Sequence, residues 1–181
     1  ISAANEDFIS ALQLTSKINT KNIDSQRRWK QKVVEAKQDA SLLASYDFTQ
    51  YNEFPGRLQN LSSNLAEGLN GSIIGAQWSE GRWPGKKALD FKRPGDCVRI
   101  SILSKHESIT ASMWVRLDGF DVNWASLVLS DGWDRPGAFH WQLNRSGYVE
   151  LAVYLSPHES PNSRTEFIIE PSDLGRWMHL A

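Results

Sequence analysis

The stretch that decides the fold is FHWQLNRSGYVELAVYL, residues 139–155. From Tyr148 to Leu155, apolar residues at the odd positions alternate with a second set at the even positions, which is the period of two expected for a half-buried strand. Residues 139–143 form a second alternating run, in which Phe139, Trp141 and Leu143 are the apolar positions. The segment between them, Asn144-Arg145-Ser146-Gly147, has the length and composition of a tight turn, so we predict a β-hairpin here.

Working outward from this hairpin, the same short period recurs from residue 45 onward. We predict strands at residues 45–48, 72–76, 87–91, 98–100, 109–117, 125–129, 139–143, 148–155 and 166–169. Turn-forming pairs such as Asn70-Gly71 and Pro84-Gly85 separate these runs. Many short strands with no helical pattern between them predict a mainly β protein, an antiparallel β-sandwich rather than a parallel sheet.

The N-terminal part has a different pattern. Residues 1–22 read as a linker or the tail of an upstream region, and residues 23–44 as an amphipathic α-helix whose apolar side chains recur at three- and four-residue steps. We expect this face to pack on the domain that follows, residues 45–181. The first residue is Ile1 and the last residues, 176–181, read as an interrupted strand, so we expect the chain to be a piece of a longer polypeptide.

Composition excludes several classes of partner. The chain of 181 residues has 20 Lys and Arg against 21 Asp and Glu, so it lacks the positive charge that nucleic acids attract, and we expect no nucleic-acid partner. No window approaches the ~20 apolar residues of a membrane span. The single cysteine, Cys97, excludes an internal disulfide. Eight tryptophans indicate a large apolar core, a stacking surface, or both.

Several segments, taken in their order along the chain, resemble LamG-like domains of the laminin G and concanavalin A-like lectin/glucanase superfamily. The opening strands are similar in residues 45–48, 70–71 and 84–91, and the central signature in ITASMWVR at 109–116. The later turn and strand are similar in LNRSGYVEL at 143–151, and the closing element in GRWMHLA at 175–181. The resemblance spans about residues 43–181 and implies a jelly-roll β-sandwich. A jelly roll has further strands after such a closing element, so the sandwich is expected to be truncated at its C-terminus, with an open edge that could self-associate.

A narrower resemblance concerns the junction between helix and β domain. Arg28-Trp29 followed by DASLLASYDF at 39–48 is similar to the junction in bacterial FecR-like proteins that carry a C-terminal LamG domain. This likeness implies a periplasmic or cell-surface location, a membrane anchor outside this piece, and a role in signalling.

The motifs of several enzyme classes are missing from the sequence. Glycosidases use two carboxylates that flank the scissile bond, and the glucanase branch places them alternately on one strand; no such run exists here. There is no Gly-x-Ser-x-Gly elbow, and the four histidines lack zinc-ligand spacing. We therefore expect a non-catalytic protein.

Calcium is the one metal that the resemblance implies, because LamG-like domains often bind it through loop oxygens. The candidate ligands are Asp96, Asp118 and Asp121, which lie in predicted loops. Asp is also a common turn residue in its own right, so a purely structural role for these side chains is the alternative.

Sugar binding requires an exposed aromatic face beside hydrogen-bonding groups. The candidate residues combine these features in one stretch of sequence, with a further aromatic residue in an earlier loop: Trp124, Asp131, Trp133, Asp134, Arg135, His140 and Trp83. The alternative is that the indoles fill the core, which is the role we assign to Trp114 and Trp177 because both lie in alternating strands.

The sequence thus predicts a recognition module that binds an extracellular carbohydrate or protein. Two other functions stay open: a glycan-cleaving enzyme of the same superfamily and a structural spacer. Exposed tryptophans beside polar groups would favour binding, paired carboxylates on one sheet would favour the enzyme, and buried tryptophans throughout would favour the spacer.

Overall fold

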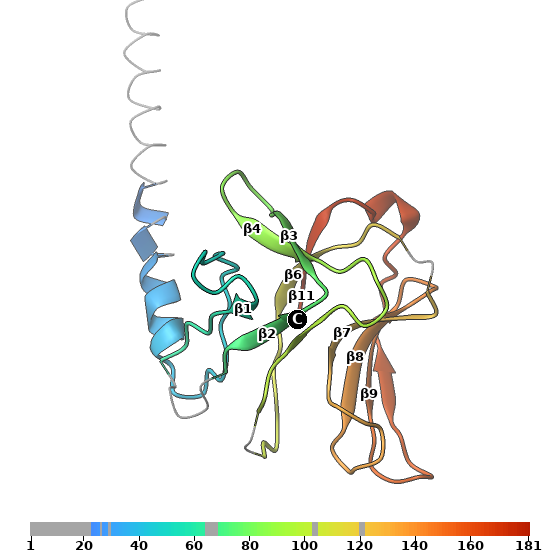
Figure 1. Ribbon diagram of the computed structural model, residues 1–181. Coiled ribbons are helices and arrows are strands. Elements are labelled where there is room, and N and C mark those ends of the chain that lie inside the picture. The colour runs from blue at the N-terminus through green and yellow to red at the C-terminus, as the bar shows by residue number, and fades with distance from the viewer. Residues whose placement is uncertain (1–22, 26, 29, 64–68, 103–104, 120–121) are drawn as a thin grey trace, which may run out of the picture. The chain divides into compact units, whose positions relative to one another are not determined.

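The structure, a computed structural model, describes residues 23–25, 27–28, 30–63, 69–102, 105–119 and 122–181. The chain gathers into two units, Ile1–Lys105 and His106–Ala181, which we call the N-terminal and C-terminal units. The predicted domain of residues 45–181 includes parts of both units, and its extent stays a prediction. Both units are built from antiparallel strands (Figure 1), which confirms the predicted mainly β class with a helix near the N-terminus.

The N-terminal helix runs over residues 23–38, of which 26 and 29 lie outside the described residues. It ends six residues before the predicted boundary at 44. The reason is a local turn: the Asp39 carboxylate accepts hydrogen bonds from the Ser41 hydroxyl at 2.7 Å and the Ser41 backbone N–H at 2.8 Å, which competes with helical bonding. The same two bonds lower the pKa of Asp39.

The expected apolar face of this helix is mostly exposed. Val33 is half-buried, whereas Ala36 and Ala40 are exposed. Trp29, which belongs to the same predicted face, lies outside the described residues. No helix in the described part of the chain has both the length and the apolar character needed to cross a membrane.

The N-terminal unit contains two small antiparallel sheets. The strands of the first, in spatial order, are β1 (Arg57–Leu58), β2 (Gly71–Ile74) and β5 (Cys97–Arg99). The second is the hairpin of β3 (Gln77–Glu80) and β4 (Lys87–Asp90). The strands predicted at 72–76, 87–91 and 98–100 are present as β2, β4 and β5, with ends that differ by at most two residues. Strands β1 and β3 were not predicted by the sequence pattern.

Residues 45–48, predicted as a strand, have no strand pairing. Phe48 adopts the left-handed conformation, with φ of 56°, which ends an extended segment. The Ser45 N–H donates to the side chain of Asn60 at 2.8 Å instead of to a strand.

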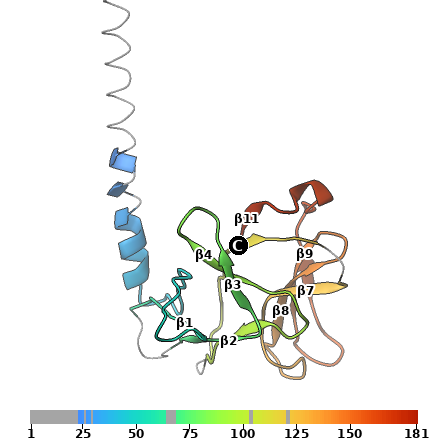
Figure 2. The ribbon, with the colours of Figure 1, turned by 45° about the horizontal axis from the view of Figure 1, so that its top comes forward.

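The C-terminal unit holds two further sheets, seen from two directions in Figures 1 and 2. Four strands lie in the order β10 (Asn162–Arg164), β9 (Val149–Val153), β8 (Phe139–Asn144) and β7 (Trp124–Leu129). The other sheet pairs β11 (Trp177–Leu180) with β6 (Met113–Arg116). The predicted hairpin at 144–147 does join β8 to β9.

A cluster of buried side chains forms the core of the C-terminal unit. Its members are Trp141, Leu143, Val149, Ile169 and Leu180. Half-buried side chains from both sheets pack against the cluster, including Met113 and Val115 of β6 and Met178 of β11. Side chains alternate along β6, so Trp114, between Met113 and Val115, is exposed. Its ring centroid lies 5.1 Å from that of His179. The prediction that Trp114 packs in the core is therefore wrong, while Trp177 is half-buried.

Gly147 fixes the end of the β8–β9 hairpin. Its φ is 84°, and a Cβ at this position would lie 2.2 Å from the Ile169 carbonyl oxygen. Only glycine tolerates both the left-handed backbone and this approach. The Ile169 N–H donates to the Gly147 carbonyl at 2.9 Å, which brings Ile169 into the core.

Residues 166–169 were predicted as a strand, and this prediction is wrong. The pairing strand is β10, which ends at Arg164. The Thr165 hydroxyl donates to the Phe167 carbonyl at 2.9 Å and accepts from the Val149 N–H at 3.2 Å. The chain bends at this point, so the residues beyond it leave the sheet.

Candidate functional site

The four-stranded sheet has one apolar face and one polar face. Directly opposed residues on antiparallel strands share a face, and Leu143 is opposed to Ala125 and Val149 on the core side. The intervening positions belong to the other side. We call this side the polar face: Trp124, Ser126, Leu129, His140, Gln142, Asn144, Tyr148, Glu150, Ala152, Tyr154, Asn162 and Arg164.

Glu150 lies at the centre of the polar face and is 6% exposed. One carboxylate oxygen accepts from the Asn144 side-chain amide at 2.5 Å, and the other accepts from the Asn162 amide at 3.3 Å. Burial of a carboxylate is costly unless its oxygens are hydrogen-bonded. The Glu150 side chain therefore acts as a brace that holds amides of β8 and β10 in fixed positions.

Asn144 links this brace to the hairpin turn. Its side-chain oxygen accepts from the backbone N–H groups of Ser146 at 2.9 Å and Tyr148 at 3.1 Å. The Asn144 amide is thus fixed at both ends. Hydrogen bonding that pre-organises polar groups in this way reduces the entropy lost when a ligand binds to them.

One end of the polar face carries a group of three rings. The Trp133 ring centroid lies 4.4 Å from that of His140 and 5.7 Å from that of Tyr154. Trp133 belongs to the loop between β7 and β8, whereas His140 and Tyr154 come from the sheet. All three side chains are half-buried, so each one keeps part of its ring surface exposed.

The opposite end of the polar face carries a second set of aromatic side chains. Trp124, opposed to Asn144 at the start of β7, is 51% exposed. The Arg164 guanidinium carbon lies 4.8 Å from the Tyr148 ring centroid, a cation–π contact. His140 and Asn144 are four residues apart on β8, which corresponds to about 13 Å along a strand. The polar face thus has aromatic surface at both ends and amides between them.

The structure brings only part of the predicted sugar site together. Trp133 and His140 are in contact, and Trp124 lies on the same face at its other end. Asp131, Asp134 and Arg135 are exposed in the loop before β8, where Arg135 Nε lies 3.5 Å from Asp134 Oδ1. Trp83 belongs to the N-terminal unit, in the β3–β4 loop, with the Arg82 guanidinium 4.9 Å from its ring centroid.

The predicted calcium ligands have local structural partners. The Asp96 carboxylate accepts from the backbone N–H groups of Lys92 at 3.0 Å and Arg93 at 2.9 Å, which closes the turn before β5. Asp118 accepts from Arg116 Nε at 3.2 Å, and Asp121 lies outside the described residues. Across the described residues, no three or more His, Cys, Asp or Glu side chains form a group that could hold a metal ion.

Sequence reasoning missed the residues that organise the polar face: Gln142, Asn144, Glu150, Tyr154 and Asn162. A signal for two of them was present, because the alternation in 148–155 places Glu150 and Tyr154 on one face. The contribution of β10 was not visible, since Asn162 joins the site only through the pairing of β10 with β9.

Comparisons with known proteins do not identify a relative. No family model matches the chain, and neither the curated proteins nor the solved structures compared with it gave a match.

Proposed function

We propose that the C-terminal unit is a non-catalytic recognition module that binds carbohydrate on the polar face of its four-stranded sheet. The observation that carries this proposal is the pairing of partly exposed rings with pre-organised amides. Sugar rings present apolar C–H faces and hydroxyl groups, which aromatic surfaces and amides respectively bind. The face has rings at both ends, near His140 and near Asn144, and these two positions lie about 13 Å apart along β8. This arrangement suits an elongated glycan.

A recognition role is favoured over hydrolysis by the carboxylates of the sheet. Strands β7 to β10 contain one, Glu150, whereas glycoside hydrolysis requires two carboxyl groups across the bond. Both Glu150 oxygens also accept hydrogen bonds from amides. A spacer role is less favoured, because Trp124 and Trp133 expose ring surface that a spacer does not need.

The wider setting is part of the same proposal. We propose a LamG-like jelly roll from a FecR-like bacterial protein, located in the periplasm or at the cell surface, with an extracellular glycan as ligand. Two alternatives are an extracellular protein ligand and a site that depends on calcium. The experiment below distinguishes both from the proposal.

The test is a glycan array probed with the full chain, with and without calcium, followed by calorimetry on any glycan that binds. We expect Trp133→Ala and Trp124→Ala each to weaken binding about tenfold or more, because each removes the burial of an aromatic side chain against the ligand. Trp83→Ala is the matched control, since it removes an exposed loop tryptophan from the other unit. The affinity of this variant for the glycan should equal that of the wild type.

Three results would contradict the proposal. Absence of binding to every glycan would favour a protein ligand or a spacer. Release of reducing ends from a bound glycan would show an enzyme. Equal binding by wild type, Trp133→Ala and Trp124→Ala would place any glycan site elsewhere. Loss of binding on chelation of calcium would add a metal to the site without moving it.

A further inference from the structure

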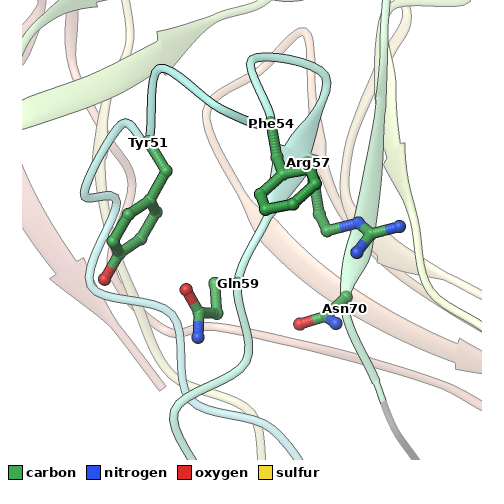
Figure 3. A pocket seen from close by; sticks show the side chains of 5 residues that line it. All are labelled: Tyr51, Phe54, Arg57, Gln59 and Asn70. Atoms are coloured by element: carbon green, nitrogen blue, oxygen red, sulfur yellow. The ribbon is translucent and has the colours of Figure 1, made fainter.

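A pocket in the N-terminal unit has the composition of a ligand site and is separate from the polar face. Its lining residues are Tyr51, Phe54, Arg57, Gln59 and Asn70 (Figure 3). The pocket volume is about 130 Å³, below the ~300–1,000 Å³ of sites for drug-sized ligands. A ligand of about one ring would fill it.

Two consecutive turns build one side of the pocket. The Phe54 N–H donates to the Tyr51 carbonyl at 3.1 Å, and the Arg57 N–H donates to the Phe54 carbonyl at 3.0 Å. These are two consecutive β-turns, residues 51–54 and 54–57. Figure 3 shows the Phe54 ring between the side chains of Tyr51 and Arg57. The Trp78 indole N–H donates to the Pro55 carbonyl at 3.1 Å, which holds the turn against β3.

The pairing of β1 with β2 supplies the polar part of the pocket. Leu58 is opposed to Gly71, so Gln59 and Asn70, the next residues outward, lie across from each other. The Asn70 side-chain oxygen accepts from the Asn60 N–H at 2.9 Å, which leaves its NH₂ group for a ligand. Gln59 is exposed and its amide points into the same space (Figure 3).

Arg57 gives the pocket its charge. Its guanidinium carbon lies 5.3 Å from the Phe54 ring centroid, and among the described residues no carboxylate forms an ion pair with it. An arginine held over an aromatic ring keeps its planar set of donors for an anion. Tyr51 and Phe54, 38% and 53% exposed, supply apolar surface on the adjoining side.

We propose that this pocket binds a single sugar ring that carries a carboxylate. The guanidinium of Arg57 pairs with the carboxylate through two parallel hydrogen bonds, the geometry that arginine favours. The amides of Gln59 and Asn70 bind ring hydroxyls, and the rings of Tyr51 and Phe54 cover an apolar C–H face. This site is independent of the proposed glycan site, because its residues belong to the other unit.

The experiment is an NMR titration of the isotope-labelled full chain with three probes: galacturonate, galactose and acetate. Galactose has the ring without the carboxylate, and acetate has the carboxylate without the ring. We expect galacturonate to shift the backbone amide signals of residues 51–54, 56–59 and 70. It should bind at least about tenfold more tightly than either of the other two probes, because only it uses both parts of the pocket.

Variants locate the site. Arg57→Gln should weaken galacturonate binding about tenfold or more, and Arg57→Lys should lose less because it keeps the charge. Arg93→Gln is the matched control, since Arg93 is an exposed arginine of the same unit whose backbone, rather than its side chain, makes the turn contact with Asp96. Tyr51→Ala tests the aromatic wall without touching the charge, and circular dichroism verifies that each variant is folded.

The proposal is overturned if galacturonate causes no shift, if galactose or acetate binds as well, or if Arg57→Gln binds like the wild type. It is also overturned if the shifts fall on the polar face and disappear in Trp133→Ala. Glycan binding that Trp133→Ala and Trp124→Ala leave unchanged would contradict the site on the polar face and leave this proposal standing, because neither tryptophan belongs to this pocket.

Discussion

Different interactions stabilise the interior of each of the two units. In the C-terminal unit, five buried side chains form one cluster, and side chains from both sheets pack around it. Among the described residues of the N-terminal unit, the buried apolar ones are few: Leu58, Leu69, Ala76 and Leu89. Its irregular segments are joined instead by side-chain hydrogen bonds to the backbone.

Asn60 is the clearest of these polar links. Its side-chain oxygen accepts from the N–H groups of Ser45 at 2.8 Å and Ser62 at 3.1 Å. Its NH₂ group donates to the Leu43 carbonyl at 3.2 Å and the Ser62 hydroxyl at 3.1 Å. One side chain thus joins residues 43–45 to residues 60–62. The C-terminal unit thus depends mainly on apolar packing, and the N-terminal unit depends on a few polar links.

The largest effect is expected for Leu143→Ala in the core of the C-terminal unit. Leu143 is 2% exposed, and truncation of a buried leucine costs about 2–5 kcal/mol through lost burial and the cavity left behind. Denaturant unfolding measures the loss, and hydrogen exchange should show that it falls on residues 106–181. Leu151→Ala is the control, because this leucine of β9 is exposed and its truncation should cost under about 1 kcal/mol.

Asn60→Ala should cost about 2–3 kcal/mol, with faster hydrogen exchange confined to the N-terminal unit. Four hydrogen bonds are lost, and each contributes about 0.5–1.5 kcal/mol, partly replaced by water. Asn52→Ala provides the control, since Asn52 is exposed and its side chain makes no hydrogen bond to a described residue. An equal increase of hydrogen exchange in both units would show that they unfold together. The two units would then not be stabilised separately.

The smallest effect is expected for Tyr46→Phe, about 1 kcal/mol at neutral pH, because the hydroxyl loses its 2.6 Å hydrogen bond to the Leu69 carbonyl. Burial raises the pKa of Tyr46 from 10.0 to about 12. Between these values the unfolded chain has released a proton that the folded chain still holds, so stability falls as the pH rises.

The phenylalanine of this variant has no proton to release, so the difference in unfolding free energy between wild type and Tyr46→Phe should shrink as the pH rises through the range between the two pKa values. Denaturant unfolding at several pH values measures it. Tyr51→Phe is the comparison, since the Tyr51 hydroxyl makes no hydrogen bond to a described residue. A difference that stays constant over this range would refute the assignment of the pH effect to Tyr46.

The candidate sites differ in how far the sequence points to them. Trp133 and His140, which the sequence predicts for a sugar site, are in contact in the structure, and their role in binding stays a prediction. Tyr51, Phe54 and Arg57 lie in a segment with Pro55 and Gly56 that reads only as a loop. The pocket that they share depends on the geometry of two turns. No periodic pattern in the sequence predicts this geometry.

The amino-acid sequence by itself determined the β class, the helix near the N-terminus, and the hairpin at 144–147, because each follows from local periodicity and turn chemistry. Only the tertiary structure decided how the chain divides into units, that Trp114 is exposed, and that Glu150 braces Asn144 and Asn162. Those features depend on strand pairing between distant residues. A register shift of one residue would turn every side chain of a strand to the other face, and local sequence does not specify which partner a strand meets.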